Sequence, residues 1–94
     1  MSRLWVVSYD ISDDRRRARL ATILEGRGER VQWSIFHCRL GIAEATALRK
    51  HINEQMELEE NDSIRWYPLC AWCEERVRKL GMSGPAERDD YYVV

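Results

Sequence analysis

The fold of this chain is decided by residues 4–10, which read LWVVSYD. The run is rich in β-branched and aromatic residues and is apolar on both faces except at Ser8, so it predicts a strand buried at the centre of a sheet. Asp10 ends this strand. The residues that follow, SDD at 12–14, supply an N-cap and an acidic first turn, which predict a helix over about residues 13–26.

The rest of the chain continues with the same two kinds of element. Apolar residues between 45 and 56 recur at helical spacing, which predicts a second helix over about residues 43–57. Residues 30–40 contain two alternating sets with a phase slip between Ile35 and Phe36, so a bulge, a bend or a very tight hairpin is expected there. Residues 64–70 predict another strand, in which Pro68 favours a sheet edge or a strand end.

These elements predict an α/β architecture of the α+β sandwich type, with two helices on one face of a largely antiparallel sheet. The ferredoxin-like order βαββαβ fits best, over a single domain of residues 1–80. Residues 81–94 have the composition of a loop and then read YYVV, which predicts a tail with an additional C-terminal strand. Pairing on this chain's own sheet edge and pairing with the sheet of a partner subunit both stay open.

The overall charge of −1 gives no general argument for a polyanionic partner, but the charge is unevenly distributed. Residues 1–40 carry eight Arg against five Asp or Glu, whereas residues 41–94 carry seven basic against eleven acidic residues. Only two of the fifteen basic residues are Lys, and the Arg bias favours phosphate contact, although GC-rich codon usage explains it equally well. The chain shows neither a secretory signal nor a membrane span, so we expect a cytoplasmic protein without a membrane partner.

Asp10 is the strongest candidate for chemistry because it lies at the carboxyl end of a buried strand, beside a helix N-terminus. On the motif alone, an Asx-turn or capping role is the simpler interpretation, and capping also explains Asp13 and Asp14. One carboxylate per chain makes a poor magnesium site, but two from a symmetric dimer, completed by water and substrate phosphate, would be adequate. Arg17 falls within the apolar stripe of the first helix, so it must snorkel or reach a carboxylate, with Asp10 as the natural neighbour.

Cys70 and Cys73 have the spacing of half a zinc site, but no second pair follows. A redox role requires the pair to open a helix after a strand, and Glu74 and Glu75 disfavour thiolates at this position. We therefore expect the two cysteines to be structural packing residues. The sequence contains no glycine-rich phosphate loop, Ser/His/Asp set or glutamate–histidine zinc motif.

Two motifs taken together resemble a known family. The first is YDISDD at 9–14 followed by Arg17 and Arg19, and the second is RVQWSIF at 30–36. They resemble CRISPR-associated protein two, a family of small endonuclease-like adaptation proteins. The resemblance extends through the strand at 65–70, the cysteine pair and the LG at 80–81, so it covers most of the chain. Trp33 is a conservative departure from the tyrosine that the family commonly has there.

This resemblance implies a ferredoxin-like homodimer, often with C-terminal strands added across the subunits. It also implies that Asp10 is the catalytic and metal-binding residue, and that Asp10 of both protomers shares a divalent metal, usually Mg²⁺. The matching positions further imply a nucleic-acid site, in which arginines hold phosphates and aromatic residues shape the cleft or stack on a base. Its members are Arg17, Arg19 and Arg30, and Tyr9 and Phe36.

Two classes of function follow from the resemblance. The first is a metal-dependent endonuclease that hydrolyses single-stranded RNA or double-stranded DNA and acts in spacer acquisition with the CRISPR spacer integrase. The second is a non-catalytic DNA-binding scaffold subunit of the spacer integration complex, and only the first class requires Asp10. A ferredoxin-like RNA-binding module would show an RNP-type pattern of exposed aromatic residues, which the sequence lacks.

Overall fold

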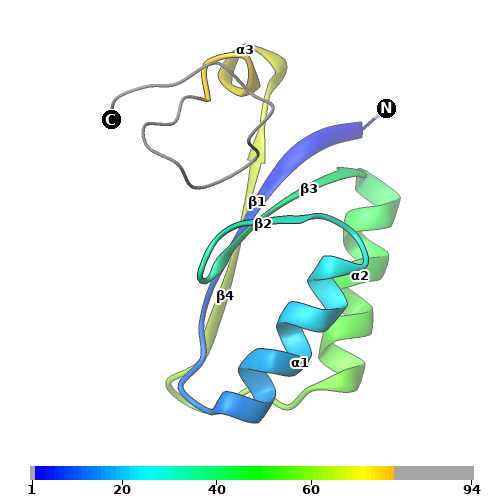
Figure 1. Ribbon diagram of the computed structural model, residues 1–94. Helices are drawn as coiled ribbons and strands as arrows, with labels where there is room; N and C mark the ends of the chain where they lie inside the picture. The colour runs from blue at the N-terminus through cyan, green and yellow to red at the C-terminus, as the bar shows by residue number, and fades with distance from the viewer. Residues whose placement is uncertain (1, 78–94) are drawn as a thin grey trace.

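The computed structural model describes residues 2–77, so the predicted tail and C-terminal strand, and the domain boundary at residue 80, lie outside the described residues. The elements follow the order βαββαβ, as predicted, and a short third helix that was not predicted comes after them (Figure 1). They are β1 (Ser2–Asp10), α1 (Asp14–Glu25), β2 (Glu29–Gln32), β3 (Ile35–Gly41), α2 (Ile42–Gln55), β4 (Ser63–Leu69) and α3 (Ala71–Glu74).

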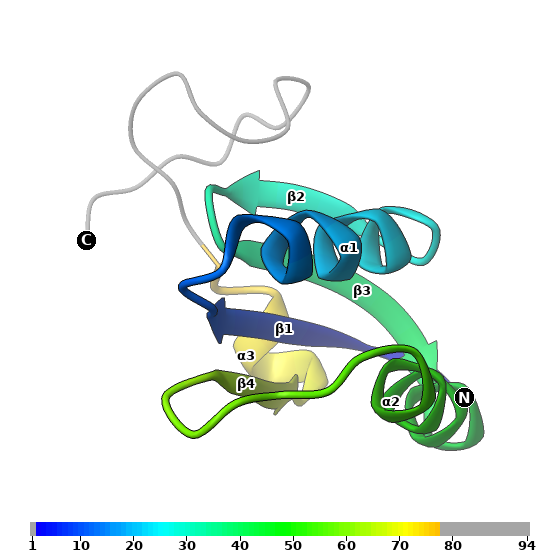
Figure 2. The ribbon, with the colours of Figure 1, turned by 90° about the horizontal axis from the view of Figure 1, so that it is seen from below.

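The four strands form one antiparallel sheet in the order β2-β3-β1-β4, which Figure 2 shows side by side. The central position of β1 is confirmed, because β1 pairs with β3 on one side and with β4 on the other. Pro68 lies in the edge strand β4, where a residue without a backbone N–H is tolerated. Together these features confirm the ferredoxin-like fold.

The segment with the phase slip is a tight hairpin, one of the three expected forms. Residues 33–34 form the turn between β2 and β3, and the register also shifts between Arg30 and Gln32. The chain therefore reverses two residues before the expected slip, because a turn and a bulge both interrupt the alternation. Ile35 and Phe36 are consecutive residues of β3 that point to opposite faces of the sheet.

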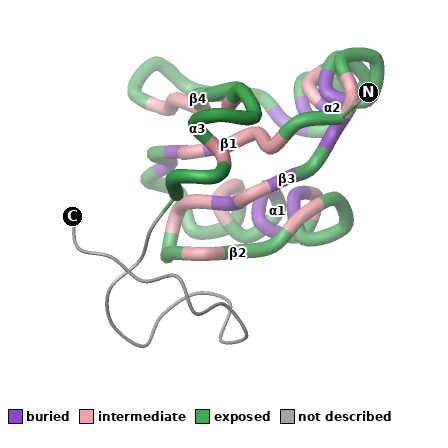
Figure 3. Tube along the Cα trace, turned by 90° about the horizontal axis from the view of Figure 1, so that it is seen from above, coloured by how far each residue is buried: buried purple, intermediate pink, exposed green. Residues whose placement is uncertain are grey.

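The hydrophobic core lies between the sheet and the two long helices, which cover the same face of the sheet (Figure 1). Figure 3 shows the buried residues where α1 and α2 meet the strands. The helices in the described part of the chain are all too short or too polar to cross a membrane. The core side chains with the least exposure are Phe36, Leu20, Leu24, Leu40, Ile52, Val7 and Cys38.

The other surface of the sheet, which α1 and α2 leave uncovered, is called the open face below. Strand alternation assigns its residues, since Val7, Phe36 and their registered neighbours point into the core and the residues between them point away. The open face consists of Leu4, Val6, Ser8 and Asp10 of β1, Ile35, His37 and Arg39 of β3, and Ser63, Arg65, Tyr67 and Leu69 of β4.

Candidate metal and nucleic-acid site

Asp10 is the last residue of β1 and lies on the open face of the sheet. It pairs with Ser63 of β4, and its two neighbours in sequence, Tyr9 and Ile11, both point into the core. The Asp10 side chain is exposed, and within residues 2–77 its carboxylate makes no hydrogen bond or ion pair. The strand thus presents an exposed carboxylate at the end of the sheet.

The helix cap is a different residue. Asp13 is the N-cap of α1, and its carboxylate accepts a hydrogen bond of 2.9 Å from the backbone N–H of Arg16. The capping interpretation is therefore confirmed for Asp13 and does not apply to Asp10. Asp14 adds the negative charge in the first turn that complements the orphan N–H groups of a helix.

Arg17 does not contact Asp10, so the expected neighbour was wrong. Its guanidinium pairs with the carboxylate of Asp14 and donates hydrogen bonds to the backbone carbonyls of Ile11, at 2.8 Å, and Ser12, at 3.3 Å. The helix brings Arg17 over the loop that leaves β1, and the nearest acceptors there are backbone oxygens. Arg17 therefore braces the turn immediately after Asp10.

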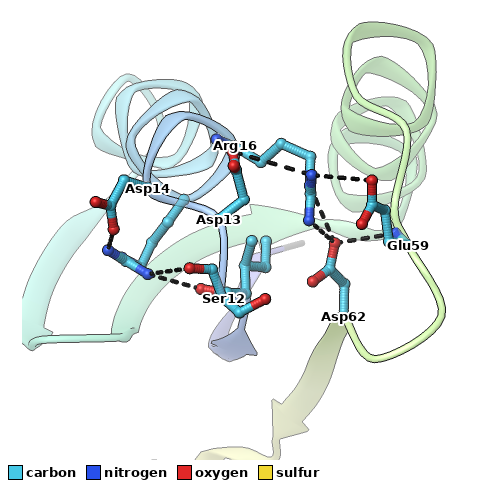
Figure 4. Close-up of polar contacts among 8 residues, drawn as sticks. Ser12, Asp13, Asp14, Arg16, Glu59 and Asp62 are labelled. Atoms are coloured by element: carbon cyan, nitrogen blue, oxygen red, sulfur yellow. Dashed lines mark hydrogen bonds and ion pairs between the residues drawn. The ribbon is translucent and has the colours of Figure 1, made fainter.

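A second brace joins this turn to the segment before β4, and sequence reasoning missed it. Arg16 donates to the Asp62 carboxylate from Nε at 3.1 Å, forms an ion pair with it from Nη2 at 2.9 Å, and reaches Glu59 at 3.3 Å (Figure 4). The Asp62 side chain is only 1% exposed. The backbone N–H of Glu59, which donates at 2.9 Å, and the guanidinium of Arg16 hold the pKa of Asp62 below its usual value.

This brace connects the two segments next to Asp10. Arg16 belongs to the helix that follows Asp10 in the chain, and Asp62 directly precedes Ser63, which pairs with Asp10 in the sheet. Nothing in the local sequence identified it. Asp62 lies in the polar run EENDS at 59–63, which has no periodicity, and its partner is 46 residues away. The only available signal was an arginine in the first turn of the helix, which capping did not explain.

A pocket of about 250 Å³ lies on the other side of the sheet from Asp10, between α1 and the β2–β3 turn. Arg30 lies beside it, donates a hydrogen bond of 2.9 Å to the Trp33 carbonyl and covers the ring faces of Trp33 and Phe36 at 5.8 and 5.2 Å. The pocket therefore combines two arginines with aromatic surface. Its lining residues are Tyr9, Asp14, Arg17, Ala18, Ala21, Arg30 and Trp33.

Tyr9 and Phe36 belong to the core, which corrects one of their two expected roles. Their rings stack on each other with centroids 6.3 Å apart, and only 4% of Tyr9 and none of Phe36 is exposed. Burial raises the pKa of the Tyr9 hydroxyl, although Arg30 and Arg17 oppose this effect. Neither ring has a free face for a base, so shaping the pocket is the role that this placement supports.

The exposed aromatic side chain at this pocket is Trp33, which is 74% exposed in the β2–β3 turn. The expected phase slip lies between Ile35 and Phe36, two residues after Trp33, so the alternating pattern gave no signal that this side chain lies outside the core. Arg19 is exposed as well, and it makes no ion pair within residues 2–77. The predicted residues therefore do not form one site. Arg17, Arg30 and Tyr9 lie at the pocket, Phe36 packs in the core, Arg19 is exposed on α1, and Asp10 lies on the open face.

Asp10 is the residue that decides whether a divalent metal ion could bind here. Within residues 2–77, no three His, Cys, Asp or Glu side chains are grouped closely enough to hold a metal ion. A free carboxylate supplies the hard oxygen ligand that Mg²⁺ prefers, but a single carboxylate leaves the rest of the octahedron to other ligands. One chain therefore supplies only part of the ligand set that a metal site would need.

Known proteins show the same sequence pattern and the same fold. The family model for CRISPR associated protein Cas2 matches residues 2–77. The chain is 41% identical over 91 residues to CRISPR-associated endoribonuclease Cas2 1 of Chloroflexus aurantiacus, which covers 96% of this chain and 98% of that relative.

Two solved structures agree with this result. A hypothetical protein from Thermus thermophilus is 38% identical and superposes with a TM-score of 0.78 over 90% of this chain and 98% of its own. A chain of the partial Cas6-RT-Cas1–Cas2 complex is 26% identical, with a TM-score of 0.67 over 92% of this chain and 98% of its own. This chain belongs to the CRISPR-associated Cas2 family.

Proposed function

We propose that this chain is a metal-dependent endonuclease that hydrolyses single-stranded RNA or double-stranded DNA as a homodimer, and that it acts in spacer acquisition with the CRISPR spacer integrase. The observation that carries the proposal is the exposed carboxylate of Asp10 on the open face, which has no hydrogen-bond or ion-pair partner within residues 2–77. Capping does not explain this residue, because Asp13 is the cap. The name of the endoribonuclease from Chloroflexus aurantiacus supports the same class of reaction.

The composition of the open face supports the homodimer. Leu4, Val6, Ile35 and Leu69 are only half-buried in one chain, and Tyr67 is 45% exposed. A partner that packs here would remove this apolar surface from water, and a two-fold interface uses the same patch on both subunits. Asp10 of each subunit then belongs to the same interface.

In this dimer, Asp10 of both subunits would hold a divalent cation such as Mg²⁺, and water and a substrate phosphate would supply the remaining ligands. A bound cation of this kind activates a water molecule and neutralises charge on the scissile phosphate. The arginines bind the flanking phosphates. Arg19 is the most available of them because it is exposed, whereas Arg17 and Arg30 use part of their donor capacity within the chain.

The second candidate function is a non-catalytic DNA-binding scaffold within a spacer integration complex. The similarity to a chain of the partial Cas6-RT-Cas1–Cas2 complex supports a partner of the Cas1 type for this chain. Both functions use the arginines and the dimer. They differ at Asp10, which only cleavage requires.

The experiment that separates the two functions is cleavage of labelled single-stranded RNA and double-stranded DNA by the purified full chain, with Mg²⁺ or with a chelator. We expect cleavage that depends on Mg²⁺, and we expect Asp10→Ala to lower its rate by at least about a hundredfold, since the variant removes a metal ligand from both subunits. Glu54→Ala is the matched control, because Glu54 is an exposed carboxylate on α2 away from the site.

A readout independent of activity completes this test. The Asp10→Ala variant should also lose binding of Mn²⁺, used as a paramagnetic substitute for Mg²⁺, whereas Glu54→Ala should retain it. Equal cleavage by wild type and Asp10→Ala would point to a contaminating nuclease and overturn the catalytic proposal. A dimer that binds DNA and the integrase without any cleavage would favour the scaffold.

A further inference from the structure

Cys70 and Cys73 lie on the surface, so the expectation that they are packing residues was wrong. Both are exposed, whereas the third cysteine, Cys38, is fully buried in the core. Cys70 directly follows the last residue of β4 and is the N-cap of α3, and Cys73 lies within that helix. The pair therefore has the strand-to-helix placement that a redox dithiol requires and that the sequence did not reveal.

The two cysteines interact at the start of α3. The backbone N–H of Cys73 donates a hydrogen bond of 3.4 Å to Sγ of Cys70. This hydrogen bond is the main cause that lowers the pKa of Cys70, and the interaction with the Cys70 side chain is the main cause that raises the pKa of Cys73. The pair thus contains one thiol suited to attack and a second thiol within reach of it.

The acidic neighbours do not produce the repulsion that was expected. The carboxylate of Glu74 forms an ion pair with Arg39 of β3, so its charge is compensated and directed toward the sheet. Arg76 stacks over the Trp72 ring at 3.7 Å and donates to the Trp72 carbonyl at 2.9 Å. Its charge opposes the rise in the pKa of Cys73, which nevertheless stays above its usual value.

We propose that Cys70 and Cys73 are a redox-active dithiol that exchanges with low-molecular-weight disulfides of the glutathione type. The Cys70 thiolate attacks one sulfur of the small disulfide, forms a mixed disulfide and releases one thiolate. Cys73 then loses its proton to solvent and attacks Sγ of Cys70, which closes the internal disulfide and releases the second thiolate. Two electrons pass from the protein to the small disulfide, which leaves as two thiols.

This dithiol is separate from the proposed nuclease site. Leu69, which precedes Cys70, pairs with Leu4 at the start of β1, whereas Asp10 is six residues further along the same strand. At a rise of about 3.3 Å per residue, the two ends are roughly 20 Å apart. Figure 1 also shows α3 at the opposite end of the sheet from the turn between β1 and α1. The redox chemistry can therefore be tested without reference to cleavage.

The test uses the full chain in a series of buffers with increasing ratios of oxidised to reduced glutathione, followed by acid quenching, alkylation under denaturing conditions and mass spectrometry. We expect the wild type to change from three alkylated cysteines to one, with Cys70 and Cys73 recovered as an internal disulfide. Cys73→Ser should accumulate the mixed disulfide at Cys70, because the resolving thiol is missing. Before oxidation, Cys70 should react with iodoacetamide roughly tenfold faster than Cys73 at neutral pH.

Matched controls make each outcome decisive. Cys38→Ala should leave the redox transition unchanged, and Asp10→Ala should do so as well, which separates failure of this proposal from failure of the proposed nuclease. The proposal is overturned if the wild type accumulates only mixed disulfides, if it forms disulfides only between chains, or if all three thiols survive the most oxidising buffer. Protection of both thiols by Zn²⁺ without any internal disulfide would assign the pair to metal binding and would also overturn it.

Discussion

The covered face of the sheet and the open face are built from alternate residues of the same strands. Within one chain, the helices bury the covered face and leave the open face partly exposed. On the covered face, Val7 and Phe36 have no exposed surface because α1 and α2 lie over them. On the open face, Val6 and Ile35 stay half-buried, and the carboxylate of Asp10 makes no hydrogen bond or ion pair within residues 2–77. Folding therefore depends on the covered face, whereas the open face is left available for association and chemistry.

The largest expected effect is on the covered face. Phe36→Ala removes a fully buried ring that stacks on Tyr9 and lies under Arg30, so it should lower the free energy of unfolding by about 3–5 kcal/mol. A small domain has a margin of similar size, so partial unfolding at room temperature is expected. Urea denaturation followed by circular dichroism measures the change. A loss below about 1 kcal/mol would show that the covered face is not what holds the fold together.

A smaller effect is expected at Gly28, where the backbone just before β2 passes close to β3. A Cβ at Gly28 would clash with the His37 carbonyl oxygen and lie 2.5 Å from Sγ of Cys38. Gly28→Ala should therefore lower the free energy of unfolding by about 1–3 kcal/mol, as overpacked cores do. Gly26→Ala is the control, because its nearest contact would be an ordinary 3.4 Å, and it should unfold within about 0.5 kcal/mol of wild type in the same urea titration.

A substitution on the open face should weaken association of the subunits rather than lower the free energy of unfolding. Tyr67→Asp places a charge on exposed apolar surface of the edge strand β4, so it should weaken the dimer at least about tenfold, or about 1.4 kcal/mol, with little change in unfolding. Leu58→Asp is the matched control, since Leu58 is similarly exposed, at 42%, and lies outside the sheet. Sedimentation velocity over a concentration series measures both variants. Equal weakening by both would move the dimer interface away from the open face.

The smallest expected effect is a pH dependence at His37, on the open face of β3. Burial lowers the pKa of His37, although Glu29 opposes this, so the unfolded chain binds the proton more readily than the folded chain. The stability contribution is fully present above the ordinary pKa of histidine, about 6.5, and is lost as the pH falls through the folded pKa. His37→Gln should therefore lose less stability than wild type between pH 8 and pH 5.5 in urea titrations.

Most of the fold could be predicted because its signals are local. The apolar run at 4–10 indicated a central strand, the 3.6-residue spacing indicated both long helices, and Pro68 indicated an edge. The exact turn in the hairpin could not be predicted, because a bulge and a turn shift the alternation together. The four residues of α3 are too few to show a period.

The candidate site was predictable only in part. Asp10 was identified from its place at the end of a buried strand, which the structure keeps. The partners of the arginines were not predictable, because Arg16 bonds to a residue 46 positions away and Arg17 bonds mainly to backbone carbonyls that any sequence would offer. The surface position of the cysteine pair was missed for the same reason, since exposure depends on where β4 ends in the sheet.

The central position of β1 also determines when the domain can form during synthesis. β1 leaves the ribosome before both of its neighbours in the sheet, since it needs β3 on one side and β4 on the other and its residue Leu4 pairs with Leu69. Until residue 69 has left the exit tunnel, the nascent chain holds an apolar strand that is paired on at most one edge. Co-translational folding of this domain is therefore completed late, and chains that stop within β4 expose an edge that favours aggregation.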